Sequence, residues 1–486
     1  MCNRLIMLLF LQASFLFVVS FSGCSNGKTS VDEDSALKVD ADDSNDSDMN
    51  DERNDIDNEA KDTDGDSPDE DSDLIAQYVT CYDEIPGEPY EGMFADPLIE
   101  VWVRKALGYE NGEKITESDL QKITEIFILG RNDLRGLEKL ANLEVFSFEV
   151  DGNIYDFTPL SNLKKLRKVE LMFNEFSETT NMNCLDESFS KLTSIEELLI
   201  DGTAIKDVSP IEQLTNLRIL DLSENQIEFL PENMGNLQKL EEFRFNKNKI
   251  DDILPLQTLI NLSVLAFSYN SVEDIFPIKN MPKLSRFNAS NNKIVDISVI
   301  ENLPNLISFV AHVNKITTLP KDFSNLKNLN YLDLSYNEIL ELPSLAGLDS
   351  LKTLYLGFNK ISDMTPLDSL ENLEVLSMAG NKITKIPILK NLKSLWDMSL
   401  EMNEITDLSG FSDNNSFPRL QRMGLSENKI ENAEPLRKRE GLGSLSIREN
   451  CIKDVSPLEE LKLNGCSISG INEQLDSCEG VMVFNF

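Results

Sequence analysis

Residues that could carry out catalysis are scarce in this sequence. His312 is the only histidine among 486 residues, so histidine-based acid–base chemistry and histidine zinc sites have almost no basis. The 84 Asp and Glu residues could include a pair for glycoside hydrolysis, but they occupy variable positions without a paired setting. The sequence contains no nucleophile elbow, phosphate-binding loop or metal-binding cluster. We therefore predict that the protein is not an enzyme and has no catalytic residue, no cofactor and no metal site.

The seven cysteines could support disulfide or lipid chemistry. An export signal, described below, would remove Cys2 and leave Cys24 for a lipid, so five others remain: Cys81, Cys184, Cys451, Cys466 and Cys478. Because five is an odd number, at least one of them is unpaired or pairs with another chain. Export permits disulfides, and one bridge within the last three is compatible with the sequence, which does not choose the pairing. No CxxC motif supports a redox or zinc site.

The formal net charge of −39 argues against nucleic acid as a partner and against direct binding to anionic lipid headgroups. Residues 31–73 alone contain 20 Asp and Glu against 3 Lys and Arg. Such a segment cannot bury enough apolar surface to offset the entropy of ordering, and its like charges extend it. We predict an acidic disordered linker at 24–73. Within it, 62–66 is similar to the start of a calcium loop, but Ser67 stands where that loop needs Gly, so calcium binding is left open.

The first 23 residues have the features of an export signal. A mostly apolar run, 5–19, has the length of a signal-peptide core rather than of a membrane span. The sequence FSGC at 21–24 resembles the lipobox of bacterial lipoproteins, although that family usually has Leu in place of Phe21. The resemblance implies that Cys24 carries the lipid, palmitate included, and becomes the new N-terminus. The next residue is Ser rather than Asp, which in such lipoproteins favours the outer membrane or the cell surface.

From about residue 120 the chain repeats itself with a period near 22. The segments 214–227, 326–339 and 370–383 share the pattern LxxLxxLxLxxNxI. Its LxL part alternates apolar and polar residues, as a strand with one buried face does. We identify sixteen units, whose LxxLxL parts begin at Ile123, Leu143, Leu166, Ile195, Leu217, Leu240, Leu262, Leu284, Leu306, Leu329, Leu351, Leu373, Leu395, Leu420, Leu442 and Leu458.

Twelve of these units have Asn at the same place after the strand. A buried Asn is costly unless both ends of its amide are paired, so we expect a ladder of asparagines that bind backbone groups where the chain turns. Asp151, Thr203 and Cys466 occupy this place in three units, and Arg131 breaks the pattern in the fourth. The twelve are Asn174, Asn225, Asn248, Asn270, Asn292, Asn314, Asn337, Asn359, Asn381, Asn403, Asn428 and Asn450.

These units resemble leucine-rich repeats, and the turns at 205–214 and 361–370 resemble the 22-residue subclass found in internalins. The chain as a whole is similar to a bacterial leucine-rich-repeat lipoprotein. The resemblance implies an α/β fold: a curved right-handed solenoid with a parallel β-sheet on its concave side and short helical or 3-10 turns on its convex side. A single unit buries too few aliphatic side chains to offset the ordering of its backbone, so only stacked units are stable.

Each end of a repeat array needs a cap over its core. Ile99, Val103, Ala106 and Leu107 have helical spacing, and a second short helix follows Thr116. At the other end we predict a short helix at 470–478 and a last strand at 481–486. The predicted order is a signal peptide at 1–23, the acidic linker at 24–73, an N-terminal region with its helical cap at 74–120, the repeat array at 121–465 and a C-terminal cap at 466–486.

In this architecture the outward residues of the strands form a concave surface where a partner would bind. Aromatic and polar residues project from or beside the strands of units seven to eleven, and we take these as the candidate partner-binding residues: Tyr269, His312, Tyr331, Asp333, Tyr336, Tyr355 and Phe358. Rigid aromatic rings with a polar tip suit an interface hot spot. Tyr and Phe also favour strands for packing alone, and the sequence does not decide between the two.

We therefore expect a monomeric binding protein whose concave face takes a protein or a cell-surface glycan. It would contact the membrane only through its N-terminal lipid and lie in the cell envelope, at the outer membrane or cell surface. The resemblance to internalins implies adhesion, although a fold does not determine a function. The alternative is a passive structural or scaffold component of the outer envelope.

Overall fold

A computed structural model of the chain describes residues 93–110, 113–129, 133–150, 156–173, 184–413 and 415–478. The chain divides into two units, residues 1–77 and residues 78–486, and all of the described residues belong to the second. The predicted signal peptide, the lipid-attachment residue Cys24, the acidic linker, Cys81 and the predicted strand at 481–486 lie outside the described residues.

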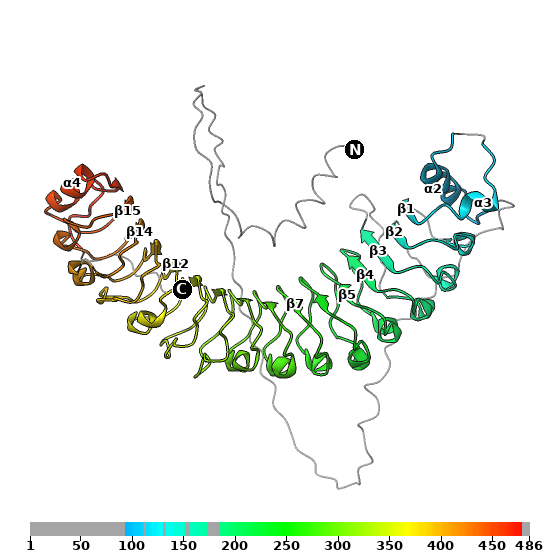
Figure 1. Cartoon of the computed structure of the whole chain (residues 1–486), viewed down its shortest axis with the longest axis horizontal. Helices are drawn as coiled ribbons and strands as arrows, with labels where there is room; N and C mark the ends of the chain where they lie inside the picture. The colour runs from blue at the N-terminus through cyan, green and yellow to red at the C-terminus, as the bar shows by residue number, and fades with distance from the viewer. Residues whose placement is uncertain are drawn as a thin grey trace, which may run out of the picture. The chain divides into compact units, whose positions relative to one another are not determined.

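The described residues contain one parallel sheet of sixteen strands, which follow one another in sequence order. Neighbouring strands pair one repeat apart, as Tyr331 does with Thr353, and Figure 1 shows the strands along the inner side of an arc. The predicted curved solenoid with a concave parallel sheet is therefore confirmed. The strands are β1 Glu125–Leu129, β2 Val145–Val150, β3 Lys168–Phe173, β4 Glu197–Asp201, β5 Ile219–Asp221, β6 Glu242–Arg244, β7 Val264–Ala266, β8 Arg286–Asn288, β9 Ser308–Val310, β10 Tyr331–Asp333, β11 Thr353–Tyr355, β12 Val375–Ser377, β13 Asp397–Ser399, β14 Arg422–Gly424, β15 Ser444–Ser446 and β16 Ser467–Ser469.

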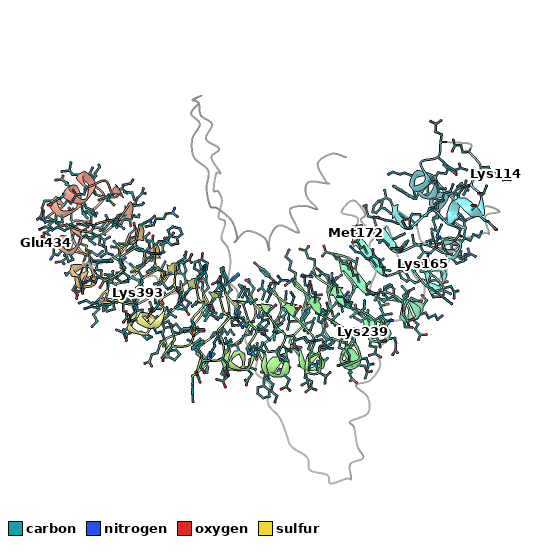
Figure 2. All side chains as sticks on the ribbon, in the orientation of Figure 1. Lys114, Lys165, Met172, Lys239, Lys393 and Glu434 are labelled. Atoms are coloured by element: carbon teal, nitrogen blue, oxygen red, sulfur yellow. A yellow bond between two sulfur atoms is a disulfide. The ribbon has the colours of Figure 1, made fainter. Side chains whose placement is uncertain are left out.

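On the outer side of the arc the chain returns through short 3-10 helices. In several of them an Asp side chain accepts a hydrogen bond from the first helical residue, two positions later. The Asp207 carboxylate accepts from the Ser209 N–H at 2.8 Å, and the Asp363 carboxylate accepts from the Thr365 N–H at 2.9 Å. In Figure 2, Met172 of β3 lies on the inner side of the arc and Glu434 on the outer side. The 3-10 helices are Leu137–Lys139, Thr158–Leu160, Glu187–Lys191, Ser209–Gln213, Glu232–Asn236, Leu254–Leu256, Phe276–Asn280, Ser298–Asn302, Thr365–Ser369, Ser409–Ser412 and Glu434–Leu436.

The predicted asparagine ladder is present. The Asn359 amide donates to the carbonyls of Leu334, Leu356 and Gly357 at 2.9–3.3 Å, and it accepts from the Ile339 N–H at 3.0 Å. Each amide thus joins two successive repeats, and both of its ends are paired. The same pattern holds for Asn225, Asn248, Asn270, Asn292, Asn314, Asn337, Asn381, Asn403, Asn428 and Asn450. Asn174 lies outside the described residues.

The core behind the sheet is a continuous apolar row that includes stacked phenylalanines. In the sixth to ninth repeats the ring centroids of successive phenylalanines lie 4.7–5.5 Å apart. Such ring contacts stabilise neighbouring repeats against each other beyond the area that they bury. We did not predict this aromatic row, because Phe replaces Leu in the repeat pattern without changing its period. The rings belong to Phe243, Phe245, Phe267, Phe287 and Phe309.

The N-terminal end of the sheet is covered by two helices. Helix α2 (Pro97–Leu107) begins after Asp96, whose carboxylate accepts from the Leu98 N–H at 2.8 Å. It buries Ile99 and Val103 against the core. Helix α3 (Glu117–Leu120) follows Thr116 and has a capping box. Both helices lie where the apolar spacing and the N-cap residue predict them.

The structure corrects the last repeat unit. We predicted a strand containing Leu458, Leu461 and Leu463, but Ser456–Leu463 is helix α4. Leu461 is 1% exposed and Leu463 is 87% exposed, so the alternation expected of a strand is absent. The spacing of Leu458 and Leu461 fits one face of a helix as well as it fits a repeat. The sixteenth strand is β16 instead, and Cys466 precedes it rather than occupying the ladder position.

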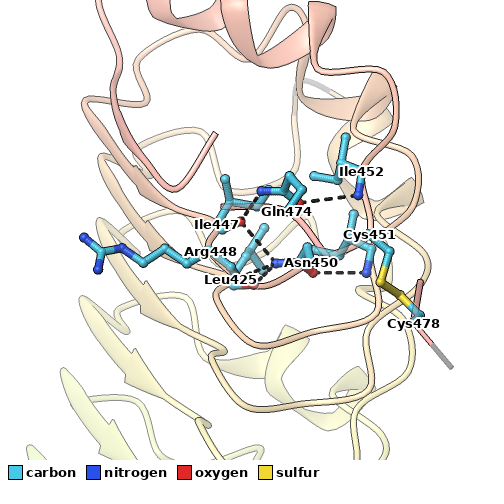
Figure 3. The surroundings of a disulfide bond; sticks show 9 residues. Leu425, Ile447, Arg448, Asn450, Cys451, Ile452, Gln474 and Cys478 are labelled. Atoms are coloured by element: carbon cyan, nitrogen blue, oxygen red, sulfur yellow. Dashed lines mark hydrogen bonds between the residues drawn. A yellow bond between two sulfur atoms is a disulfide. The ribbon is translucent and has the colours of Figure 1, made fainter. Parts of the chain in front are cut away.

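The predicted helix at 470–478 is also wrong, because Gln474 has another role there. Its Nε2 donates to the carbonyls of Ile447 at 2.9 Å and Gly470 at 2.7 Å, and its Oε1 accepts from the Ile452 N–H at 3.4 Å (Figure 3). These are the bonds that a ladder Asn makes in earlier repeats. Gly470 has a φ of +88°, outside the helical region. The segment therefore closes the ladder instead of forming helical hydrogen bonds.

A disulfide joins Cys451 to Cys478 and holds this closing segment against the fifteenth repeat (Figure 3). Cys466 is buried and has a free thiol, whose pKa burial raises to about 11. The expectation of one bridge within the last three cysteines is confirmed, and Cys184 is disulfide-bonded as well. Over the ranges that the structure describes, no helix combines the length and apolarity that a bilayer span requires.

Candidate partner-binding surface

The concave surface is built from the first and third residues of each short strand. In β10, Leu332 is buried between Tyr331 and Asp333, which are half-buried on the concave side. The same alternation places Thr353 and Tyr355 of β11 on that side. Because all of the strands are parallel and in register, equivalent residues of successive repeats form columns along the arc. Sequence position within the repeat thus decides which residues can meet.

Tyr331 and Tyr355 form an edge-to-face pair on this surface. Their ring centroids lie 5.7 Å apart at an interplanar angle of 88°. The pairing register brings Asp333 next to Tyr355, so the two rings meet diagonally across β10 and β11. Burial and then the negative charge of Asp333 raise the pKa of both phenols, so both remain neutral at physiological pH. The pair presents ring surface and phenol hydroxyl groups beside one carboxylate.

Asp333 connects the tyrosine pair with His312. One carboxylate oxygen accepts from the Ser335 N–H at 3.0 Å, and the other lies 3.5 Å from His312 Nδ1. The imidazole also lies 3.4 Å from Ser290 Oγ and 3.3 Å from Asn291 Nδ2. His312 therefore belongs to a polar network on the concave surface that also contains Ser290, Asn291 and Asp333.

The other three candidate residues do not lie on strands. Tyr269, Tyr336 and Phe358 each come just before a ladder asparagine, where the backbone has a φ of +55° to +58°. This left-handed position recurs in twelve consecutive repeats and turns the chain out of the sheet, so its side chains stand along one edge of the concave surface. The residues of this edge column are Gly202, Glu224, Lys247, Tyr269, Asn291, Val313, Tyr336, Phe358, Gly380, Met402, Glu427 and Glu449.

Within the edge column, Tyr336 and Phe358 stack face to face. Their centroids lie 4.3 Å apart with an interplanar angle of 9°, and half of Tyr336 remains exposed. The next residue of the column is Gly380, and a Cβ there would come within 2.6 Å of the Phe358 ring. The absence of a side chain at Gly380 thus gives the Phe358 ring the space that it occupies.

The seven candidate residues therefore form two groups and one outlier. His312, Tyr331, Asp333 and Tyr355 meet on the strands, and Tyr336 stacks with Phe358 on the edge column. Tyr269 is 55% exposed on the same column, but Asn291 and Val313 separate it from Tyr336. The sequence placed all seven on or beside the strands of units seven to eleven and did not show which of them contact one another.

An exposed apolar patch near the N-terminal cap was missed. Trp102 of α2 meets Phe127 of β1 edge-to-face at 5.6 Å, and its indole N–H donates to the Leu129 carbonyl at 3.3 Å. Phe127, Leu129 and Val101 are exposed around it. The signal was present in the first strand, EIFIL, where the outward positions Phe127 and Leu129 are apolar as well as the inward ones.

A carboxylate with an unusual pKa lies nearer the N-terminal end of the concave surface. Desolvation, and then the charges of Glu224 and Asp221, raise the pKa of Asp201 at the end of β4 to about 6. Lys247 opposes this shift and pairs with Glu224 at 2.5 Å. Nowhere in the described ranges do three or more His, Cys, Asp or Glu side chains converge in a way that could hold a metal ion.

Comparison with known proteins agrees with this architecture. The model of the family "Leucine Rich repeats (2 copies)" matches residues 193–233, 327–369 and 371–413. No curated protein matches the sequence significantly. Among solved structures, an internalin of Listeria monocytogenes is 27% identical over 78% of this chain and 96% of its own, with a TM-score of 0.54.

Two further structures share the fold at lower identity. A leucine-rich-repeat protein of Leptospira interrogans is 23% identical over 79% of this chain and all of its own, with a TM-score of 0.56. A plant peptide hormone receptor, solved in complex with RGF2, is 17% identical over 74% of this chain and 65% of its own, with a TM-score of 0.57. The chain therefore contains leucine-rich repeats, and its described part has the fold of a leucine-rich-repeat solenoid, with an internalin among its structural neighbours.

Proposed function

We propose that this protein binds a protein or cell-surface glycan partner on its concave face while a lipid on Cys24 holds it in the cell envelope. It acts as an adhesive binding module and is monomeric. The protein lies at the outer membrane or cell surface, and its repeats are of the 22-residue internalin type. No step of catalysis is assigned to it.

The observation that carries this proposal is the pair of aromatic groups on the concave side. Tyr331 with Tyr355, and Tyr336 with Phe358, place four rings on two neighbouring repeats, and Tyr336 is half exposed. Aromatic rings that are held rigid by their neighbours lose little entropy on binding, which is why they dominate interface energetics. Solvent-exposed rings gathered in one place indicate an interaction surface.

The solved relatives support a binding role without naming a partner. Leucine-rich-repeat domains typically bind proteins, and the plant receptor of similar fold was solved in complex with RGF2. The anchor rests on the signal sequence and the FSGC lipobox at 21–24. The acidic segment that follows would act as an extended tether, because like charges repel one another.

A pair of photoreactive residues tests the binding role. Benzoylphenylalanine in place of Tyr336 on the concave edge should crosslink a specific partner in intact cells. The matched control replaces Phe276, an equally exposed aromatic residue at the start of an outer-side 3-10 helix. The crosslink from position 336 should be competed by excess unmodified chain and should be lost in Tyr355→Ala. Digestion with protease or glycosidase then shows whether the partner is a protein or a glycan.

Two results would reject binding on this face. If both positions give the same products, the contacts are not specific to the concave side. If neither gives a saturable product, the passive structural component is the better explanation.

Labelling with radioactive palmitate tests the anchor separately. The parent chain should incorporate label and fractionate with the outer membrane, whereas Cys24→Ala should do neither. Label that persists in the Cys24→Ala chain would place the lipid elsewhere.

A further inference from the structure

The concave surface changes its charge character along the arc. Near the N-terminal end, opposite charges neutralise each other on the surface itself: Lys168 pairs with Glu170 at 2.6 Å, and Arg244 pairs with Glu242 at 2.7 Å. From β9 to β13 the character is different. Each of these strands contributes three surface positions: its first residue, its third residue and the residue two places after its end. These positions include Asp333, Asp397 and Glu401 but no Lys or Arg. The tyrosine pair lies in this stretch, whose own surface positions supply no basic residue other than His312.

Asp333 lies on the same face of the sheet as the tyrosine pair, two residues after Tyr331 and opposite Tyr355 in the strand register. Within the described ranges no Lys or Arg lies within 4.0 Å of it, and its one basic neighbour is His312 at 3.5 Å. Asp397, two strands further on, is compensated by Arg422 at 3.3 Å. The negative charge of Asp333 contributes to the raised pKa of both the Tyr331 and the Tyr355 phenol, so the three groups interact electrostatically.

Two aromatic ring faces beside a carboxylate have a defined chemical preference. The face of a tyrosine ring is electron-rich and attracts a cation within about 6 Å of its centroid. A half-buried carboxylate gains most from a charged hydrogen-bond donor, and a guanidinium offers a planar fork of such donors. A neutral sugar or an acidic group would leave the charge of Asp333 without compensation.

Resting on the proposed function, we propose that Tyr331, Tyr355 and Asp333 together receive a basic side chain, an arginine or lysine, from a protein partner. The cation lies against the edge-to-face rings and pairs with the carboxylate. The stacked Tyr336 and Phe358 on the neighbouring edge contribute apolar contact to residues that flank the basic one. The partner is therefore a protein with an exposed basic residue rather than an uncharged glycan.

The test uses the full chain and two tripeptides that differ in one atom group. Acetyl-glycyl-arginyl-glycinamide carries the cation, and its citrulline analogue has a neutral urea of nearly the same shape. Saturation-transfer NMR and calorimetry, with each peptide titrated to millimolar concentration, should show the arginine peptide binding about tenfold more tightly. Asp333→Asn, which keeps the shape of the side chain, should abolish the difference between the two peptides.

Ring variants separate the aromatic contribution from folding effects. Tyr355→Phe keeps the ring face and should retain binding of the arginine peptide, whereas Tyr355→Leu should weaken it several-fold. Phe276→Ala changes an exposed aromatic residue on the outer side of the arc, so it is the control and should bind as the parent does. Circular dichroism confirms that each variant is folded before its binding is compared.

The outcomes distinguish this inference from the proposed function. Equal binding of the two peptides, or no effect of Asp333→Asn, overturns the basic-side-chain receptor. If a crosslinked partner is still captured at position 336 in that case, the concave face binds in another way and the proposed function stands. If the arginine peptide binds as expected but no partner is captured in cells, the receptor stands and the cellular role proposed above fails.

Discussion

The side-chain amide of Gln474 donates to the main-chain carbonyl of Ile447 at 2.9 Å, and so takes the place that a ladder asparagine holds in earlier repeats. The preceding rung, Asn450, makes the equivalent bonds to Leu425 and Ile447. The ladder thus ends on a glutamine 24 residues after its last asparagine. The closing segment does not follow the backbone path of the earlier repeats, and the longer glutamine side chain reaches the Ile447 carbonyl and the Ile452 N–H from it.

Replacing Gln474 by Ala should loosen the C-terminal end. The Ile452 N–H would lose its acceptor, at a cost of about 1–3 kcal/mol, and the Ile447 carbonyl would keep only its bond from Asn450. Hydrogen exchange should rise first around β15 and β16, since each repeat of a solenoid is stabilised mainly by its neighbours. The exposed Asn472→Ala is the control and should leave exchange unchanged. Equal protection in the two variants would contradict the assignment of Gln474 as the last rung.

An internal rung should matter more than an exposed asparagine. Asn359→Ala leaves the Ile339 N–H without its acceptor, and an unpaired buried group costs roughly 1–3 kcal/mol. The carbonyls of Leu334, Leu356 and Gly357 each lose one of two donors, since Asn337, Asn381 and the Tyr336 N–H still donate to them. Asn372 is exposed and makes one bond, to the Asp349 carbonyl at 2.8 Å, so Asn372→Ala should cost about 0.5 kcal/mol. Urea unfolding followed by circular dichroism measures both. Similar midpoints for the two variants would mean that the ladder is not a major source of stability.

The thiol of Cys466 should react only after unfolding. Burial raises its pKa to about 11, so at pH 8 almost none of it is the reactive thiolate. Because the folded-state pKa lies above that of an unfolded cysteine, this group favours the folded state below about pH 8.5 and loses that effect as the pH rises towards 11. Iodoacetamide labelling with mass spectrometry should modify Cys466 in urea and not in native buffer. Rapid native labelling at pH 8 would show that the end of the array opens readily.

Asp201 should make stability depend on pH between about 4 and 6. Its folded-state pKa of about 6 exceeds the value of an unfolded Asp, near 3.9, so the folded chain holds this proton more tightly. The stabilisation of the folded state by this bound proton is complete below about pH 4 and is lost as the pH rises through 6. Asp201→Asn should therefore gain a small amount of stability relative to the parent at pH 7 but not at pH 4. The same shift in melting temperature at both pH values would argue against the raised pKa.

Gly380→Ala probes the stacked aromatic pair. An alanine at φ +67° carries backbone strain of about 1–2 kcal/mol, and its Cβ would press on the Phe358 ring 2.6 Å away. Gly441→Ala is the matched control: φ there is +80°, but an added Cβ meets nothing within 4 Å. Near-ultraviolet circular dichroism should change for Gly380→Ala alone, and the crosslink from position 336 should weaken. An unchanged aromatic signal would show that the Tyr336–Phe358 stack adapts to the extra methyl group.

The fold was predictable because its signals are local and repeated. Each LxL alternates with period two, and each asparagine stands at a fixed distance from its strand, so a single unit such as 214–227 already contains the rule for its neighbours. Repetition makes the parallel order of the strands almost unavoidable, since each unit can bury its apolar face only on the next. The helix at 97–107 was predictable from its apolar spacing, and the short helix at 117–120 from its N-cap residue Thr116.

The tertiary structure decided everything that depends on contacts between units. Leu458 and Leu461 satisfy the spacing of a helix and of a repeat equally, and only the packing of α4 beside β16 selects the helix. The pairing of Cys451 with Cys478 and the use of Gln474 as a rung follow from the path of the closing segment. Whether two aromatic residues meet depends on register and on which of them leave the sheet at a left-handed turn, as Tyr336 does and Tyr331 does not. Each of these contacts joins residues of neighbouring repeats. The sequence gives the type of each residue but not the direction in which the chain turns between them, and that direction decides which side chains meet.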